Sequence, residues 1–189
     1  MSSLPLDADG HLYVFAYGSL IWRPDFVHLG QESAVLRGYH RRFCLTSRHY
    51  RGTPETPGLV LGLDRGGTCR GVAFRVCPDA APEVLDYLEA RENVNGEMVY
   101  DRRLLPLRLG SGREVRGIAY VANRSHPAYC RPCEASTAET IARGRGQAGT
   151  NLDYLLNTAR QLASMGLRDS RLERLVKLAT AEVTCGQPA

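Results

Sequence analysis

The sequence lacks the features that place a protein in a membrane or direct it out of the cell. No apolar run approaches the roughly 18 residues that cross a bilayer. Residues 1–10 have no basic residue followed by an apolar core, so they do not resemble a signal peptide. We therefore expect a cytoplasmic protein that does not bind membranes.

Common catalytic signatures are also absent. The sequence has no glycine-rich nucleotide-binding loop, no paired histidines of a zinc protease and no serine nucleophile elbow. Internal repeats, low-complexity tracts and linkers are absent too. A chain of 189 residues then favours a single domain over residues 1–189. Its core is expected at about 12–181, with loose ends at 1–10 and 186–189.

Lysine is nearly missing, since Lys177 is the only one, and arginine carries almost all of the positive charge. The net charge is +4. The densest basic cluster contains Arg37, Arg41, Arg42, Arg48 and Arg51. No helix-turn-helix, zinc-finger or RNA-binding signature accompanies it, so we expect no nucleic-acid partner. Solvated strand faces, or weak attraction of an anionic small substrate, explain the cluster better.

Six cysteines are present, at positions 44, 69, 77, 130, 133 and 185. Cys130-Arg-Pro-Cys133 has the spacing of a redox or zinc motif. Zinc requires a second pair of ligands, and Cys69 and Cys77 lie in a strand pattern, so no metal site is predicted. Reduced loop cysteines are favoured, and a thiol oxidoreductase using Cys130 and Cys133 is an alternative.

Apolar residues mostly follow strand spacing from residue 12 to residue 121, and helix spacing from residue 134 to residue 181. Strands are predicted at 12–16, 34–45 (broken by Gly38), 59–63, 68–76, 98–109 and 114–121. Hairpin turns are predicted at Asp64-Arg-Gly-Gly67 and at Gly110-Ser-Gly112. Helices are predicted at 83–91, 136–143, 151–165 and 172–178, with Thr150 as a cap and Gly166 as a stop. Strands followed by helices indicate an α+β domain whose sheet curls into a barrel.

The first strand runs directly into Tyr17-Gly18-Ser19-Leu20. Such a turn leaves backbone N–H groups at the end of the sheet, where they can bind a carboxylate or a developing oxyanion. Trp22 and Phe26 follow and could wall a cavity. Taken alone, these residues favour a tight turn with packed aromatic side chains.

Glu92 lies where the helix predicted at 83–91 ends. A carboxylate there faces the negative end of the helix dipole, and burial would raise its pKa further. Such a group can transfer protons near neutral pH. Taken alone, a solvated glutamate paired with Arg91 is favoured, and Glu89 and Glu97 are alternatives.

Two further segments are expected to be well ordered. Arg51–Gly58 holds two prolines and two glycines in eight residues, which makes a rigid loop before a strand. Gly149-Thr-Asn-Leu-Asp-Tyr154 opens the long amphipathic helix. Tyr154, in its first turn, either offers its hydroxyl to a ligand or is partly buried.

In this order, the four segments resemble the ChaC-type γ-glutamylcyclotransferases, the glutathione-specific branch of the γ-glutamylcyclotransferase-like superfamily. The resemblance runs from about Tyr13 to about Leu178. It rests on Val-Phe-Ala-Tyr-Gly-Ser-Leu-Ile-Trp-Arg-Pro-Asp-Phe, the loop at 51–58, the Arg91-Glu92 pair and the Gly-Thr-Asn helix start. Many members have Gly-Gly-Tyr soon after the glutamate, whereas residues 93–100 of this chain differ.

The resemblance implies a γ-glutamylcyclotransferase-like mixed β-barrel with peripheral helices and a helical C-terminal third. It implies a cofactor-free lyase that cyclises the γ-glutamyl group of glutathione, giving 5-oxoproline and cysteinylglycine. Glu92 matches the essential acid/base, and Tyr154 matches a tyrosine that helps hold the substrate. The family holds the γ-glutamyl group in a backbone cradle, and the resemblance places this cradle at Tyr17, Gly18, Ser19 and Leu20.

Two alternatives to this activity stay open. The chain could act on other γ-glutamyl amines or amino acids. It could also be a non-catalytic γ-glutamyl-binding relative, an interpretation that the different sequence around Met98 keeps open.

Overall fold

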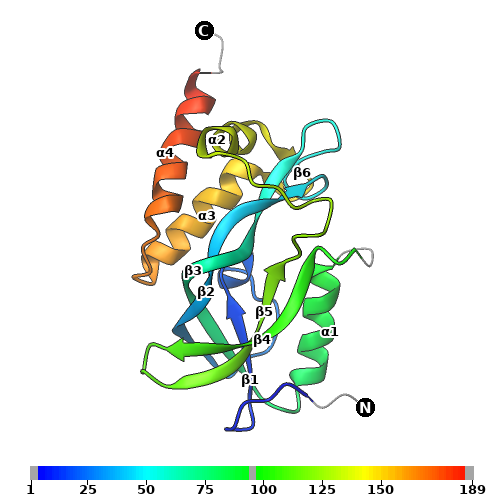
Figure 1. Cartoon of the computed structure of the whole chain (residues 1–189), viewed down its shortest axis with the longest axis vertical. Helices are drawn as coiled ribbons and strands as arrows, with labels where there is room; N and C mark the ends of the chain where they lie inside the picture. Colours follow the sequence, from blue (N-terminus) through cyan, green and yellow to red (C-terminus); the bar gives the residue numbers. More distant parts are fainter. Residues whose placement is uncertain (1–3, 94–96, 186–189) are drawn as a thin grey trace. The chain divides into compact units, whose positions relative to one another are not determined.

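The computed structural model describes residues 4–93 and 97–185 (Figure 1). The chain divides into two units, of which the first is Met1–Arg42 with Gly62–His126. The second is Phe43–Leu61 with Pro127–Ala189. Two long strands, β2 (Gly30–Ser47) and β3 (Gly58–Val76), contribute residues to both. The prediction of a single domain stays a prediction.

Five strands form a closed barrel in the order β1-β3-β2-β4-β5. β1 (Leu12–Ala16) pairs antiparallel with the end of β3 and parallel with β5 (Glu114–Ala122). β4 (Tyr100–Leu109) runs antiparallel to both β5 and β2. The barrel is therefore mixed, which confirms the α+β barrel expected from the sequence.

The barrel strands contribute most of the largest fully buried side chains in the described part of the chain. Every residue of β1 is buried. The fully buried side chains include Tyr13, Phe15, Leu36, Phe74, Leu107 and Ile118. Burial of each contributes about 1.5–3 kcal/mol to folding. Glycine lets the strands approach closely, since a Cβ at Gly71 would lie 2.3 Å from the carbonyl oxygen of Ala16.

The hairpin predicted at Asp64-Arg-Gly-Gly67 is wrong, because β3 continues through these residues without a turn. Gly66 and Gly67 have φ angles of 96° and 72°, which deform the strand but do not reverse it. The carboxylate of Asp64, a common turn former, instead accepts a hydrogen bond of 2.7 Å from Arg124 Nε. In the same way, Gly38, with a φ of 84°, does not break β2.

The second predicted hairpin is confirmed, since β4 and β5 pair along their length from Tyr100↔Ala122 to Arg108↔Glu114. Its turn lies between Leu109 and Glu114, where the N–H of Leu109 donates to the carbonyl of Arg113 at 2.8 Å. Figure 1 shows this pair as a long, curved ribbon.

All four predicted helices are present. α1 (Ala81–Glu92) belongs to the first unit. In the second unit α2 (Glu134–Arg143), α3 (Asn151–Ser164) and α4 (Ser170–Cys185) pack against one another (Figure 1). A two-stranded sheet, β6 (Arg145–Gly146) with β7 (Gly149–Thr150), precedes α3. No helix in the described part of the chain is long and apolar enough to cross a membrane.

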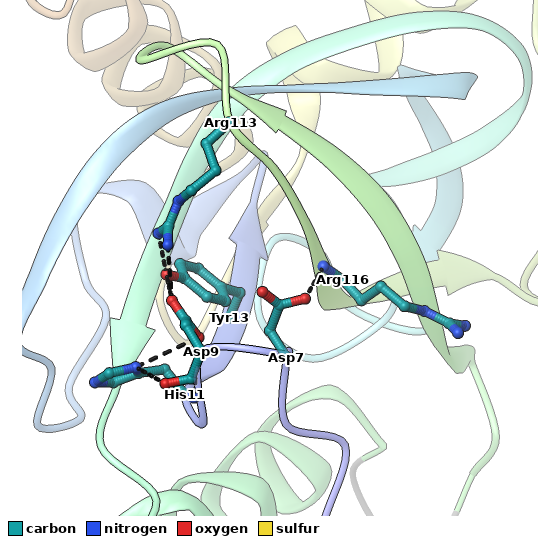
Figure 2. Close-up of polar contacts among 6 residues, drawn as sticks. All are labelled: Asp7, Asp9, His11, Tyr13, Arg113 and Arg116. Atoms are coloured by element: carbon teal, nitrogen blue, oxygen red, sulfur yellow. Dashed lines mark hydrogen bonds and ion pairs between the residues drawn. The ribbon is translucent and has the colours of Figure 1, made fainter.

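The segment before β1 is held against the barrel (Figure 2). Asp7 accepts a hydrogen bond of 2.8 Å from the backbone N–H of Arg116, and Asp9 accepts one of 2.7 Å from the hydroxyl of Tyr13. Asp9 also pairs with Arg113 at 2.9 Å. Although burial opposes ionisation of Asp9, these hydrogen bonds hold its pKa at about 2. The prediction that residues 1–10 are loose is therefore wrong for Asp7 and Asp9. Residues 1–3 and 186–189 lie outside the described part of the chain.

Candidate active site

The loop that follows β1 is built on a buried tyrosine. Tyr17 is 7% exposed, and its hydroxyl donates a hydrogen bond of 2.8 Å to the carbonyl of Tyr120 on β5. A short 3-10 helix that the sequence did not predict, η1 (Ser19–Ile21), follows directly. The chain thus leaves the barrel wall and turns within three residues of the end of β1.

The turn leaves several backbone donors without a partner. The N–H groups of Ile21, Trp22 and Arg23 donate to the carbonyls of Gly18 and Ser19 at 3.0–3.2 Å. Within residues 4–93 and 97–185, the N–H groups of Gly18, Ser19 and Leu20 make no hydrogen bond. A 3-10 turn satisfies only its later donors, so the first ones stay available to a ligand.

Arg41 on β2 holds the same loop from within the first unit. It is 7% exposed, and its Nε and Nη2 donate to the carbonyls of Tyr17 and Arg70 at 2.5 and 2.7 Å. The sequence suggested that Arg41 belongs to a solvated basic face. The structure shows instead that Arg41 is buried. Arg41 and the buried Phe43 are two positions apart in the strand, so their side chains lie on the same face. This spacing is the sequence signal that could have placed Arg41 on the inner face.

Glu92 is the last residue of α1, and its side chain is 14% exposed. Burial raises the pKa of this carboxyl to about 7. The positive charge of Arg91 opposes this shift, and the negative charge of Glu89 adds to it. The sequence-based alternative of a solvated surface glutamate is therefore wrong. At neutral pH the group can both accept and release a proton.

The other two candidate carboxylates have different surroundings. Glu89 is 42% exposed and pairs with Arg102 at 3.6 Å. Its carboxylate also accepts hydrogen bonds from Tyr120 (3.2 Å) and from the side chain of Asn93 (2.7 Å). The side chain of Glu97 is exposed. Of the three, Glu92 is the one with a buried carboxyl.

Asn93 secures the end of α1, a role that the sequence did not reveal. Besides donating to Glu89, its side chain accepts a hydrogen bond of 3.1 Å from the backbone N–H of Tyr100, the first residue of β4. The side chain of Asn93 therefore links the end of α1 to the start of β4. Residues 94–96 lie outside the described part of the chain.

Aromatic side chains after the loop pack together. The ring of Phe26 lies 5.4 Å from that of Phe74 and 6.2 Å from that of Tyr87. His28 is 4.9 Å from Phe74. The ring of Phe26 is therefore packed against other aromatic side chains, as one of the two interpretations of the sequence proposed, rather than standing free as the wall of a cavity.

Tyr154 belongs to the second unit, as does the loop at 51–58. Tyr154 is 6% exposed, and its hydroxyl oxygen accepts a hydrogen bond of 3.3 Å from the N–H of Leu61. The ring of Phe43 packs edge-on at 5.8 Å, and the guanidinium of Arg51 lies 5.2 Å from the ring centre of Tyr154. Tyr154 is thus more deeply buried than the sequence suggested.

Asn151 explains the Gly-Thr-Asn motif. Its buried amide exchanges two hydrogen bonds with the backbone of Leu59, accepting at 2.6 Å and donating at 2.7 Å. Thr150 caps α3 as predicted, accepting from the N–H of Asp153 at 3.0 Å. The sequence signal for Asn151 was its helical spacing to Leu155, which places both on the buried face.

Cys130 and Cys133 lie in the segment before α2. Both are free thiols, and Cys133 is exposed at the N-cap of α2. A hydrogen bond with Ser136 lowers the pKa of the Cys133 thiol. Among the described residues no group of three or more histidine, cysteine or acidic side chains is placed to hold a metal ion.

A protein-family comparison decides the affiliation of the chain. The model of the ChaC-like protein family matches residues 12–182. The chain is a member of the ChaC-like family. This confirms the resemblance inferred from its sequence.

Relatives of the ChaC-like chain are found in bacteria, animals and fungi. An Escherichia coli protein named glutathione-specific gamma-glutamylcyclotransferase is 34% identical over 89% of this chain and 72% of its own length. A Mus musculus protein named glutathione-specific gamma-glutamylcyclotransferase 1 is 36% identical over 97% of this chain and 86% of its own. A Schizosaccharomyces pombe protein with the bacterial relative's name is 34% identical over 83% of this chain and 85% of its own.

The fold of the ChaC-like chain also has solved counterparts. The crystal structure of a yeast gamma-glutamyl cyclotransferase specific to glutathione superposes with a TM-score of 0.84 at 23% identity, over 95% of this chain and 100% of that one. A structure titled gamma-glutamyl cyclotransferase gives a TM-score of 0.55 at 14% identity, over 87% and 86% of the two chains. The γ-glutamylcyclotransferase-like fold predicted from the sequence is therefore confirmed.

Proposed function

We propose that this chain is a γ-glutamylcyclotransferase that cyclises the γ-glutamyl group of glutathione, releasing 5-oxoproline and cysteinylglycine. The observation that carries the proposal is the buried carboxyl of Glu92, whose pKa of about 7 suits proton transfer at neutral pH. The names of the ChaC-like relatives support the same substrate.

The reaction takes place within one molecule. The α-amino nitrogen of the substrate attacks its own γ-carbonyl carbon, a five-membered lactam forms, and the bond from that carbon to the cysteine nitrogen breaks. Because nucleophile and electrophile are already joined, a folded substrate reacts with a large effective concentration. The chemistry needs no cofactor, so the protein has to hold the substrate folded, move protons from the attacking nitrogen to the departing one and stabilise one oxyanion.

Glu92 moves the proton in this scheme. The substrate ammonium, with a free pKa of about 8, must lose a proton before its nitrogen can attack. A carboxylate with a pKa of about 7 accepts that proton far more readily than a solvated glutamate does. The same carboxyl then returns the proton to the departing cysteine nitrogen as the C–N bond breaks. It takes the second proton from the ring nitrogen and passes it to the released amine, which leaves as an ammonium, so Glu92 ends the cycle ionised.

The loop after β1 supplies the oxyanion donors. The N–H groups of Gly18, Ser19 and Leu20 are directed to no acceptor among the described residues. One well-placed donor of this kind contributes roughly 3 kcal/mol to the stability of a tetrahedral oxyanion. Tyr17 anchors the loop through its bond to Tyr120.

Tyr154 is proposed to help hold the substrate. Its hydroxyl oxygen is fixed by the N–H of Leu61, and its ring is confined by Phe43 and Arg51. A side chain confined in this way positions a ligand with little loss of side-chain entropy on binding.

The test is to incubate the purified protein with reduced glutathione and a chelator, and to quantify 5-oxoproline and cysteinylglycine. We expect equimolar products from the wild type and a loss of at least about 10³-fold in kcat for Glu92→Gln, which keeps the shape of the side chain and removes the base. Glu114→Gln, at an exposed position, is the matched control. Wild-type turnover by Glu92→Gln would move the role to Glu89 or Glu97, each testable by the same substitution.

A substrate panel separates the remaining alternatives. Glutathione, γ-glutamylcysteine and γ-glutamylalanine would be compared by kcat/KM, and glutathione is expected to react fastest. A faster reaction of another γ-glutamyl compound would assign the chain to that substrate. Binding of glutathione without any product would identify a non-catalytic relative.

A further inference from the structure

Arg91 contacts several residues around the candidate site, among them Ser19, Arg23, Tyr87 and Glu92. It lies in the last turn of α1, and its side chain is 19% exposed. Its Nη1 donates to the carbonyl of Arg23 at 2.7 Å and to the hydroxyl of Tyr87 at 2.6 Å. Its Nη2 donates to the Oγ of Ser19 at 3.2 Å. One guanidinium therefore joins both ends of the Ser19–Arg23 segment to α1.

The same guanidinium lies beside the proposed acid/base. Arg91 Nε is 3.6 Å from Oε1 of Glu92. We propose that Arg91 is a positioning residue of this site, which fastens the Ser19–Arg23 segment to the end of α1 next to Glu92. The inference deepens the proposed function, on which its catalytic consequences rest.

Geometry favours arginine over lysine at this position. The contacts with Ser19, Arg23 and Glu92 use three different nitrogens of one planar group. The guanidinium carbon also lies 5.9 Å from the ring centre of Tyr87. A lysine would keep the charge, but its single ammonium cannot bridge these acceptors together.

Charge gives Arg91 a second, separable effect. Burial raises the pKa of Glu92, Arg91 lowers it and Glu89 raises it. Tyr120 also interacts with Glu92 directly, because burial and then the charges of Glu89 and Glu92 raise the pKa of its hydroxyl. Asp25 lies 3.8 Å from Arg91, and both Arg102 and the hydroxyl of Tyr120 contact Glu89. Loss of the Arg91 charge is therefore expected to raise the pKa of Glu92 further.

Two substitutions distinguish these effects. Arg91→Lys keeps the charge and loses the bridging contacts, whereas Arg91→Gln loses both. In either variant we expect the amides of Ile21, Trp22 and Arg23 to exchange with deuterium at least about tenfold faster than in the wild type. The pKa of Glu92, followed by NMR of the labelled carboxyl, is expected to stay near the wild-type value in Arg91→Lys and to rise in Arg91→Gln.

Turnover of glutathione supplies the catalytic readout. Displacement of the loop is expected to lower kcat/KM by about 10- to 100-fold in both variants. The acid limb of the pH profile is expected to move to higher pH in Arg91→Gln alone. Arg103→Gln, whose exposed side chain pairs with Asp101, is the control and is expected to leave all three measurements unchanged.

Exchange and titration test Arg91 even in a protein without turnover. Wild-type exchange of these amides in both folded variants would overturn the positioning role. An unchanged pKa of Glu92 in Arg91→Gln would overturn the electrostatic role. An inactive wild type would overturn the proposed function alone, because neither exchange nor titration depends on catalysis.

Discussion

At the residue scale, two glutamates on one helix show how surroundings assign a chemical task. Glu89 and Glu92 lie three positions apart, so helical periodicity places them near one another on α1. Glu89 is 42% exposed and has three polar partners, whereas Glu92 is 14% exposed and beside one arginine. The sequence could name both as candidates. It could not rank them by burial, because burial depends on side chains that are distant in the sequence.

Arg41 allows a direct test of the support beneath the Tyr17 loop. Arg41→Gln removes the donors to the buried carbonyl of Tyr17 and to the partly buried carbonyl of Arg70. We expect a loss of about 2–3 kcal/mol in the free energy of unfolding, measured by urea denaturation. Arg37→Gln, at an exposed position on the same strand, is the control and should change stability by less than about 0.5 kcal/mol. Equal effects of both substitutions would contradict the anchoring role.

At the element scale, local signals predicted most helices and strands, and long-range contacts explain the errors. The helix opened by Thr150 was predictable because its cap, its apolar spacing and Gly166 lie within one segment. The turn predicted at Asp64–Gly67 failed because Asp64 bonds to Arg124, 60 residues away. The pairing of Asn151 with Leu59, 92 residues apart, was equally invisible to local patterns.

The loop at 51–58 provides a prediction for an element. A Cβ at Gly58 would lie 2.1 Å from the carbonyl oxygen of Arg51 and 2.8 Å from Oδ1 of Asn151. Gly58→Ala is therefore expected to force this loop and the start of α3 apart, lowering the melting temperature by about 10 °C or more. Gly30→Ala, where an added Cβ would meet nothing within 4 Å, is the matched control. A Gly58→Ala protein as stable as the control would show that the loop can relax without cost.

At the scale of the whole molecule, the pKa of Glu92 links stability to pH. The folded value is about 7, against 4.5 for a free glutamate. Below about pH 4.5 the carboxyl is protonated in both states, so it has no effect on stability. As the pH rises from about 4.5 to 7, the unfolded chain loses this proton first, which destabilises the folded state. Above about pH 7 the full effect, about 3 kcal/mol, is present.

Glu92→Gln should therefore stabilise the protein at alkaline pH. We expect it to raise the free energy of unfolding by up to about 3 kcal/mol near pH 8 and to have almost no effect near pH 4. Denaturant titrations at the two pH values measure this difference, with the exposed Glu114→Gln as control. A variant that is less stable than the wild type near pH 8 would show that the ionised carboxylate is held by favourable contacts.

The central claim is that Glu92, with a near-neutral pKa, transfers the proton during cyclisation of glutathione. The measurement that tests it most directly is the pH dependence of kcat/KM for this substrate in the wild type. The account predicts an acid limb with an apparent pKa of about 7, matching the carboxyl titration of Glu92. A rate that stays constant down to about pH 5, or an unchanged acid limb in Glu92→Gln, would contradict it.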